Sequence, residues 1–384
     1  MKSRISSALG SVLLIVGCAG PGASPSASLV HSGPSAQPSA ASVGPSAPAT
    51  SSWEPTGLGF DADGNLLVTD CIGGHLYRVD PSGAASQIAG TGVSTTSGGL
   101  SGEEVPATEA DLHCPADATA DVANNILVVD HANNRIRLIE SGGMIRTIIG
   151  SGPIGTGSDD GNLAGDGGQA LAATLQEPWG IVFDDDGNLF IADRDNHAIR
   201  KVDPTGVITT VAGSGDRGFS GDGDPAIEAD LSRPQSVAID REGNVYFSDS
   251  DNHVIRRVGV DGVITSIAGT GEAGYSGDGG LATAATIIDP NGLVFDLQGN
   301  LYFVDDSANV VRRIGADGVI TTVAGTGEAG FAGDGGPGTA AALSAAGDII
   351  FDEVGNLYIA DAGNHRIRVL HPDGTIDTFS TGLP

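Results

Sequence analysis

The stretch from Arg233 to Gly271, RPQSVAIDREGNVYFSDSDNHVIRRVGVDGVITSIAGTG, decides the fold. It contains four short apolar runs rich in β-branched and aromatic residues, at 237–239, 245–247, 254–258 and 263–268. Each run is bounded by Gly, Asp or Asn, which supply the positive backbone dihedrals that tight turns need. The stretch therefore predicts four antiparallel strands, named a, b, c and d in chain order.

Close copies of this stretch recur along the chain and align on the aspartate before the first turn. The last four of these aspartates are 56 residues apart, and the two earlier intervals are 60 and 63 residues. A second aspartate ends strand b, and strand c carries an arginine. The three series are Asp61, Asp121, Asp184, Asp240, Asp296 and Asp352; Asp70, Asp130, Asp193, Asp249, Asp305 and Asp361; and Arg78, Arg137, Arg200, Arg256, Arg312 and Arg368. Six units predict an all-β, six-bladed β-propeller of four-stranded blades over residues 53–384, because radial packing buries the faces that one sheet leaves exposed.

We expect strand a of each blade to line a central channel. Blade 1 begins with its own strand a and blade 6 ends with its own strand d, so no blade is obviously completed from both termini. Residues 51–53 are a candidate for an additional outer strand.

The first 52 residues differ in composition from the six repeats. Two basic residues, Lys2 and Arg4, precede an apolar run at 12–16, which is the layout of a secretory signal. Residues 15–18, Ile-Val-Gly-Cys, resemble the lipobox of bacterial lipoproteins. The resemblance implies a signal peptide over 1–17, a lipid on Cys18, and an Ala/Ser/Pro-rich linker over 18–52 that cannot fold. It implies an extracytoplasmic location at the bacterial cell membrane or outer membrane; an ordinary signal peptide with a chance cysteine is the alternative.

The net charge restricts the classes of partner that the chain can bind, and the cysteines indicate a disulfide. The chain has 48 acidic and 18 basic residues, a formal net charge of -30, which repels nucleic acid and anionic lipid and excludes nucleic-acid binding. Besides Cys18 the chain has Cys71 and Cys114. These two lie in b–c and d–a connections, which emerge on the same face of a propeller, so outside the cytosol a disulfide is plausible; two unpaired thiols are the alternative. We expect a monomer.

The units GNVYFSDSDNHVIRRV, GNLFIADRDNHAIRKV and GNLYIADAGNHRIRVL resemble NHL repeats. The resemblance covers residues 54–380 and implies a six-bladed propeller with a central channel. Blades 1, 2 and 5 depart from the Asn-His pair of the pattern, with Gly-Gly-His at 73–75, His-Ala-Asn-Asn at 131–134 and Ser-Ala-Asn at 307–309. The long connections after strand d share a GDG segment and an Ala-rich turn of helix. They resemble those of secreted bacterial propellers and teneurin-type cell-surface receptors.

Two sets of repeated residues are candidate metal ligands. His197, His253 and His365 lie four residues after the strand-b aspartate. Peptidyl-hydroxyglycine lyases, propeller enzymes similar to this chain, use zinc, so a transition-metal site is one hypothesis and structural hydrogen bonding at the start of strand c the other. The GDG loops offer carboxylates to calcium, the cofactor most compatible with the sequence although none is certain; an aspartate between glycines is otherwise a turn residue. The loop aspartates are Asp166, Asp222, Asp278 and Asp334.

Residues that break the repeat are better candidates for ligand binding. The second position of strand a holds Thr56, Ala116, Trp179, Gln235, Asn291 and Gly347, and Asp117 and Asp348 replace the small residue that follows. Aromatic and amide groups beside carboxylates can hold a sugar or a peptide, so we select Trp179, Gln235, Asn291, Asp117 and Asp348. Variation at an exposed rim is the alternative.

No HExxH, GxSxG, phosphate-binding GxxxxGK or CxxC motif occurs, so no catalytic residue is assigned. The leading hypothesis is a cell-envelope-anchored platform that binds a protein, peptide or glycan ligand and touches the membrane only through its lipid. A metal-dependent propeller enzyme of lyase or lactonase type is the alternative, and a purely structural envelope component is a third.

Overall fold

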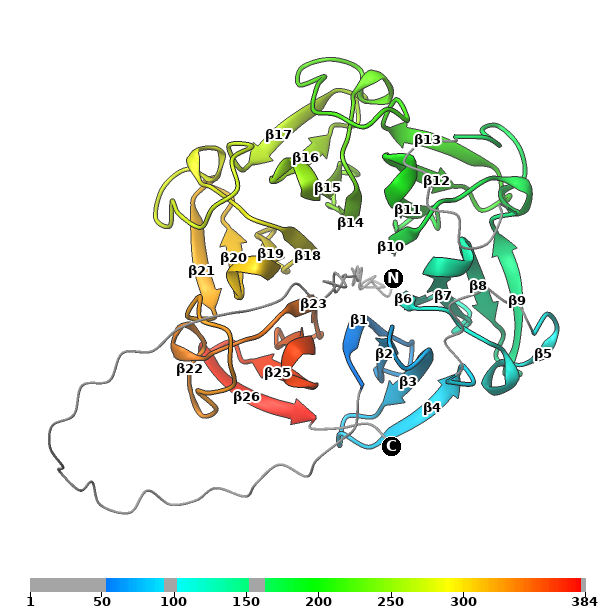
Figure 1. The fold of residues 1–384 in the computed structure, drawn as a ribbon, viewed down its shortest axis with the longest axis horizontal. Helices are drawn as coiled ribbons and strands as arrows, with labels where there is room; N and C mark the ends of the chain where they lie inside the picture. Colours follow the sequence, from blue (N-terminus) through cyan, green and yellow to red (C-terminus); the bar gives the residue numbers. More distant parts are fainter. Residues whose placement is uncertain (1–52, 93–101, 152–162, 381–384) are drawn as a thin grey trace, which may run out of the picture.

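The computed structural model describes residues 53–92, 102–151 and 163–380. The expected signal peptide, Cys18 and the linker lie outside these residues. The described chain forms six antiparallel sheets arranged around a central axis, in chain order (Figure 1).

Each blade consists of four strands that are consecutive in sequence, and the first strand is the innermost (Figure 1). The strands a to d are β1 (Pro55–Phe60), β2 (Leu66–Asp70), β3 (His75–Val79) and β4 (Ala85–Ala89) in blade 1; β6 (Pro115–Ala120), β7 (Ile126–Asp130), β8 (Arg135–Ile139) and β9 (Met144–Ile149) in blade 2; β10 (Pro178–Phe183), β11 (Leu189–Asp193), β12 (Ala198–Val202) and β13 (Ile208–Ala212) in blade 3; β14 (Pro234–Ile239), β15 (Val245–Asp249), β16 (Val254–Val258) and β17 (Ile264–Ala268) in blade 4; β18 (Pro290–Phe295), β19 (Leu301–Asp305), β20 (Val310–Ile314) and β21 (Ile320–Ala324) in blade 5; and β23 (Ala346–Phe351), β24 (Leu357–Asp361), β25 (Arg366–Leu370) and β26 (Thr375–Ser380) in blade 6. The predicted six-bladed, all-β architecture is confirmed.

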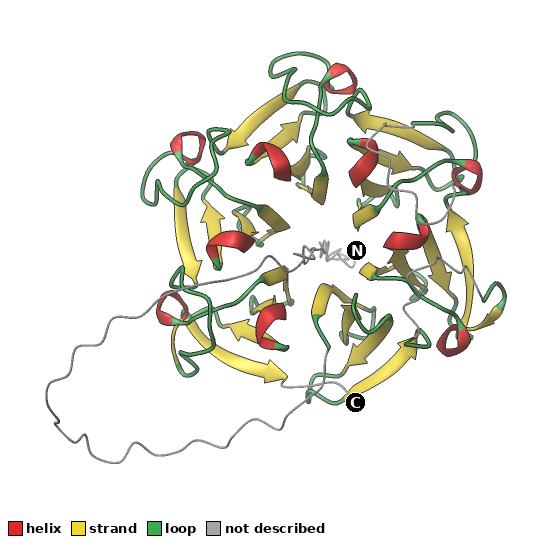
Figure 2. Cartoon of the chain, viewed as in Figure 1, coloured by secondary structure: helices red, strands yellow, loops and turns green. Residues whose placement is uncertain are grey.

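Short 3₁₀ turns occupy two connections of the blade, one near the axis and one near the rim (Figure 2). The b–c turns, which the sequence did not predict, are η2 (His131–Asn133), η4 (Arg194–Asn196), η6 (Ser250–Asn252), η8 (Asp306–Ala308) and η10 (Ala362–Asn364). The d–a turns are η1 (Ala107–Glu109), η3 (Ala170–Ala172), η5 (Ala226–Glu228), η7 (Ala282–Ala284) and η9 (Gly338–Ala340). None of the helical turns in the described ranges is long enough to cross a membrane.

The aspartate that aligns the repeats forms the a–b turn. Asp240 Oδ1 accepts the backbone N–H groups of Glu242 and Asn244, and its Oδ2 accepts the Asn244 amide at 2.7 Å. The same pattern holds at Asp184 and Asn188, so the DDDGN segment is a hairpin turn. Such side-chain capping explains why Asp and Gly-Asn recur together.

The hydrophobic core consists of six clusters, one at each boundary between neighbouring blades. The d–a connection inserts small and branched residues into the boundary, as Ala226, Ala229 and Leu231 do between blades 3 and 4. The boundary between blades 6 and 1 buries Trp53 against Leu58 and neighbouring residues of both blades. Within residues 53–380, as far as they are described, the ring therefore closes by side-chain packing, and each blade is built from its own consecutive strands.

Additional outer strands come from the d–a connections. β5 (Val105–Pro106) pairs with β9, and β22 (Gly336–Pro337) pairs with β26. Trp53 packs at the blade 6–blade 1 boundary and adds no outer strand, so the expectation for residue 53 is wrong; residues 51 and 52 lie outside the described ranges.

Candidate ligand-binding mouth of the central channel

The aspartate at the end of strand b organises the b–c turn. Asp249 is buried; its Oδ1 accepts the Ser232 N–H at 2.6 Å and its Oδ2 accepts the Asn252 amide at 2.9 Å. Burial raises the pKa of Asp249 to about 7, although the Asn252 amide and Arg256 act in the opposite direction. Because this arrangement recurs, the Asp and Asn of the repeat are scaffold residues.

The position after Asn is left-handed in every blade. His197, His253 and His365 have φ values of 52°, 58° and 55°, and Gly74, Asn134 and Asn309 occupy the same position in the other blades. The His365 ring Nδ1 lies 2.8 Å from Trp53 O, and His197 Nδ1 accepts the Arg233 N–H at 3.3 Å. The histidines thus connect blades 3, 4 and 6 to the blade that follows. The Asn and Gly substitutes in the other blades are residues that tolerate positive φ.

The strand-c arginine is buried in five blades and joins two carboxylates. Arg256 Nη1 lies 3.6 Å from Asp249 Oδ2, and its Nη2 lies 2.6 Å from Asp222 Oδ1 in the GDG loop. The prediction for blade 1 is wrong: Arg78 is displaced by one residue, is 35% exposed and pairs with Asp61 at 2.7 Å. Tyr77 takes the buried position there, because it is the third residue of strand c, where the other five blades have the arginine.

The loop aspartates are engaged by the scaffold. Asp166, Asp222, Asp278 and Asp334 each contact the strand-c arginine through one oxygen and a strand-d group through the other. In the residues that the structure describes, no group of three or more His, Cys, Asp or Glu side chains is placed to hold a metal ion. The calcium and transition-metal assignments stay predictions.

The b–c turns surround the inner strands at one end of the ring, which we call the mouth. Turn η4 contacts both β10 of its own blade and β14 of the next. His131 Nδ1 lies 3.1 Å from Pro178 O, and Ser250 Oγ donates to Pro290 O at 2.9 Å, so the first residue of a turn meets the start of the following strand a. These first residues, the mouth residues, are Cys71, His131, Arg194, Ser250, Asp306 and Ala362. Six equivalent positions therefore carry six different side chains, of which those of His131, Ser250 and Ala362 are buried and those of Cys71, Arg194 and Asp306 are partly exposed.

The five ligand-binding candidates lie in the walls below the mouth and are buried, which contradicts an exposed rim. Trp179 packs its ring 4.4 Å from the His131 ring, with the Arg194 guanidinium 5.2 Å away. Burial lowers the pKa of His131 to about 3, so the imidazole is neutral. Among the residues that the structure describes, Trp179 Nε1, Gln235 Oε1 and both polar atoms of Asn291 meet no hydrogen-bond partner.

Asp117 and Asp348 link blades through the channel wall. Asp117 Oδ2 accepts the Ile181 N–H at 2.9 Å, and Asp348 Oδ2 accepts the Leu58 N–H at 2.7 Å. Ser236 Oγ accepts the Leu293 N–H in the same way. Burial raises the pKa of Asp117 to about 7, and burial together with the Asp117 charge raises that of Asp348 well above its usual range. These carboxylates are positioned as wall residues.

Charge is distributed unevenly around the mouth. At blade 3, Arg194 pairs with Glu177 at 2.7 Å and with Asp195 at 3.2 Å. At blade 5, Asp289 and Asp306 lie near further carboxylates. Burial and the Asp289 charge raise the pKa of Asp306 to about 8, and burial and the Asp251 charge raise that of Asp289 to about 6. This acidic sector favours a basic group of a ligand.

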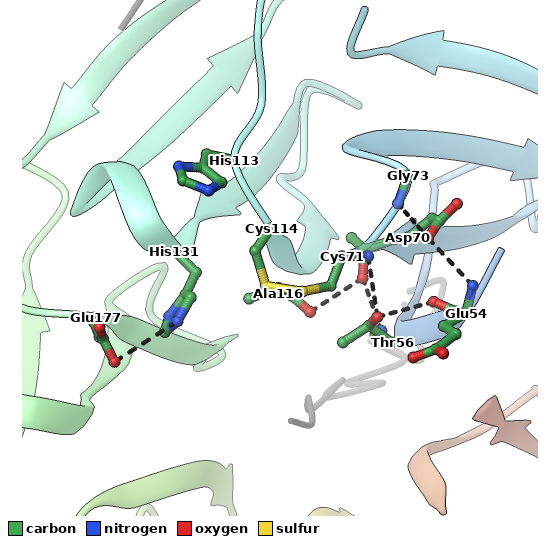
Figure 3. The surroundings of a disulfide bond; sticks show 12 residues. Glu54, Thr56, Asp70, Cys71, Gly73, His113, Cys114, Ala116, His131 and Glu177 are labelled. Atoms are coloured by element: carbon green, nitrogen blue, oxygen red, sulfur yellow. Dashed lines mark hydrogen bonds and ion pairs between the residues drawn. A yellow bond between two sulfur atoms is a disulfide. The ribbon is translucent and has the colours of Figure 1, made fainter. Parts of the chain in front are cut away.

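A disulfide joins Cys71 and Cys114 beside this mouth (Figure 3). It connects the b–c connection of blade 1 to the residue before strand a of blade 2. Thr56 Oγ1 accepts the Cys71 N–H at 3.1 Å and donates to Glu54 O at 2.9 Å. The bond therefore fixes the boundary between blades 1 and 2.

Apart from Cys71, the sequence alone did not single out the mouth residues, nor Asp289 or the 3₁₀ form of the b–c turns. The available signal was the comparison of one position across all copies, because the residues around it repeat and these do not. The prediction compared strand a, whose side chains turned out to be buried.

The fold and the repeated hydrogen bonds define the class of protein: the chain is a six-bladed β-propeller. A model of the teneurin NHL domain matches residues 155–218, 215–274 and 270–330, and the chain is accordingly an NHL-repeat propeller. Human teneurin-4 (Homo sapiens) is 27% identical over 354 residues, which cover 82% of this chain; the chain spans only 12% of that relative.

Solved structures show the same fold. An auxiliary nutrient binding protein from Bacteroides ovatus superposes with a TM-score of 0.57 at 18% identity, covering 85% of this chain and 69% of its own. Virginiamycin B lyase from Staphylococcus aureus gives a TM-score of 0.50 at 16% identity, covering 87% and 86%. Binding proteins and enzymes both occur among these structures, and at such identities the likeness concerns the fold alone.

Proposed function

We propose that this protein is a lipid-anchored, extracytoplasmic NHL-repeat propeller that binds a protein, peptide or glycan ligand at the mouth of its channel. The single observation that carries the proposal is the set of six different side chains at six equivalent positions. A scaffold that needed only to fold would tolerate the same residue at each, as it does at the strand-b aspartate. Specificity on a repeated platform lies in the side chains of its loops.

The acidic sector at blade 5 indicates the preferred chemistry. Burial raises the pKa values of Asp289 and Asp306, and the charges of neighbouring carboxylates raise them further. A basic group arriving at this sector relieves the repulsion, so ligands with a lysine, an arginine or an amino group bind more tightly than neutral ones.

The test is a peptide and glycan array probed with the full-length chain. The variant Asp289→Ala/Asp306→Ala gives blade 5 the residues that blade 6 has at these positions, Ala345 and Ala362, so the scaffold accommodates it. We expect at least tenfold weaker binding of the captured ligand. Glu242→Ala, in the exposed a–b turn of blade 4, is the control and should bind as the parent does. Absence of any ligand, or equal binding by the double variant, contradicts the proposal.

The lipid anchor is tested separately. Metabolic labelling with an alkyne palmitate should mark the parent and leave the Cys18→Ser variant unlabelled. Equal labelling of both, or of neither, rejects anchoring through Cys18 and leaves the mouth unaffected.

The metal-dependent enzyme is the second hypothesis, and we do not advance it. The nearby lyase fold indicates only that such a scaffold can carry chemistry. In the described ranges, the histidine Nδ1 atoms of His253 and His365 bond to backbone carbonyls of the following blade, which leaves these side chains at blade boundaries.

A further inference from the structure

Three half-exposed aromatic side chains occupy equivalent positions on successive long loops. Phe219, Tyr275 and Phe331 precede the GDG segments of blades 4, 5 and 6, and 51%, 42% and 45% of their surfaces are exposed. The loops lie at the rim of the ring, away from the mouth (Figure 2). We call these three residues the aromatic ladder.

Each ring is held in place by the buried arginine beneath it. The Arg256 guanidinium lies 5.2 Å from the centre of the Phe219 ring, Arg312 lies 5.2 Å from Tyr275, and Arg368 lies 5.0 Å from Phe331. Tyr275 is further fixed by a 2.8 Å hydrogen bond between its hydroxyl and Thr322 Oγ1. At Phe331 the Arg366 guanidinium lies closer still, 3.6 Å from the ring centre. Each ring is therefore held against the scaffold, and ordering it on binding costs little conformational entropy.

Hydrogen-bonding groups surround each ring. The loop aspartates paired with these arginines keep 45%, 39% and 38% of their side chains exposed, at Asp222, Asp278 and Asp334. Ser220 Oγ contacts Asp230, and Ser276 Oγ contacts Thr286. Each platform thus combines a flat apolar surface with oxygens that accept hydroxyl protons.

The ladder is confined to one half of the ring. In blade 3 the equivalent residue is Leu163, so the GDG loop does not require an aromatic side chain at this position. In blade 2 the equivalent Leu100 lies outside the described residues. Aromatic rings at three consecutive positions consequently add something beyond the scaffold role, namely planarity.

We propose that the aromatic ladder binds an uncharged polysaccharide. Sugar rings present flat C–H faces edged by hydroxyl groups, which complements an aromatic face edged by carboxylate and hydroxyl oxygens. A polymer of identical units matches three identical platforms, whereas a folded partner surface has no such repetition. The net charge of -30 repels anionic polymers. The carboxylates beside the rings already pair with the arginines, so we commit to a neutral polymer over a cationic one.

The number of platforms that one polysaccharide chain reaches determines its affinity for the protein. A single ring binds a sugar weakly, but a chain that reaches several platforms gains up to about 10²–10⁴-fold in avidity without any new contact. The polymer should therefore bind at least tenfold more tightly than its tetrasaccharide. This inference does not rest on the proposed mouth function, because the two surfaces share no residue.

The experiment is native affinity electrophoresis of the full-length chain in gels that contain hydroxyethyl cellulose, galactomannan or soluble starch. The parent should be retarded by at least one polymer. Phe219→Leu/Tyr275→Leu/Phe331→Leu, which installs the residue found in blade 3, should lose at least tenfold in affinity while its melting temperature stays close to that of the parent.

Two control variants distinguish binding at the aromatic ladder from nonspecific apolar binding and from binding at the mouth. Val260→Ser removes an apolar residue that is 76% exposed outside the ladder, and Asp289→Ala/Asp306→Ala alters only the mouth; both should be retarded as the parent is. The proposal is overturned by the absence of retardation in all three polymers, by unchanged retardation of the triple variant, or by equal affinity for polymer and tetrasaccharide.

Discussion

Replacing Arg256 with Met tests the structural interpretation of the repeated arginine. The side chain is fully buried, and its two terminal nitrogens face Asp249 at 3.6 Å and Asp222 at 2.6 Å. Met fills a similar volume but leaves Asp249 as a buried carboxylate without a cation. Breaking a buried ion pair from one side costs about 3–5 kcal/mol.

The expected shift in melting temperature follows from the size of the ring. Unfolding entropy of about 2.1 cal/mol/K per residue over roughly 330 residues gives about 0.7 kcal/mol/K. A loss of about 4 kcal/mol therefore lowers the melting temperature by about 6 °C, measured by calorimetry at pH 8. The matched control, Arg78→Met, removes an arginine whose pair with Asp61 is partly exposed, and should cost no more than about 1 kcal/mol.

The pH dependence sharpens this prediction. The pKa of Asp249 is raised to about 7, so at pH 5 the native carboxyl is protonated and needs the arginine less. The destabilisation by Arg256→Met should be smaller at pH 5 than at pH 8. Equal melting temperatures of the two arginine variants, or a larger effect at pH 5, refutes the reasoning.

Three further predictions concern the channel wall, the disulfide and the left-handed turn. The pKa of Asp117 in the folded protein, about 7, exceeds that in the unfolded chain, so the stability that this carboxyl contributes is present at low pH. About 4 kcal/mol of this stability is lost as the pH rises from about 4 to 7. Asp117→Asn should flatten the fall in melting temperature between pH 5 and pH 8, and an unchanged slope contradicts the raised pKa. Cys71 and Cys114 are 43 residues apart, so the Cys71→Ser/Cys114→Ser variant should lose about 3–4 kcal/mol in urea unfolding relative to the oxidised parent, and reductant should not destabilise it further. His253 has φ of 58°, so His253→Val should cost about 1–2 kcal/mol whereas His253→Asn, which copies Asn309 of blade 5, should cost less; a reversed order excludes backbone strain as the cause.

The repeated part of the fold could be predicted because every copy has the same pattern of strand and turn residues. The apolar runs, the Asp of the a–b turn and the Gly-Asn pair all indicate one four-stranded unit, and the structure contains it six times. The error at Arg78 arose because blade 1 carries its arginine one position later in strand c, which leaves Tyr77 at the buried position.

The site was harder to predict, because burial depends on packing between blades. Trp179, Gln235 and Asn291 differ between copies, but the neighbouring blade covers them, which no single unit reveals. The contacts of the GDG aspartates are also formed across distant residues: Asp222 meets Arg256, 34 positions later. Sequence spacing identified the residue types and not these partners.

The most direct test of the central claim is hydrogen–deuterium exchange of the full-length chain with and without a ligand captured on the array. Binding at the mouth predicts slower exchange in the b–c turns, at residues 194–196, 250–252 and 306–308, and unchanged exchange in the a–b turns at 184–188 and 240–244. Protection of the a–b turns with no change in the b–c turns contradicts it.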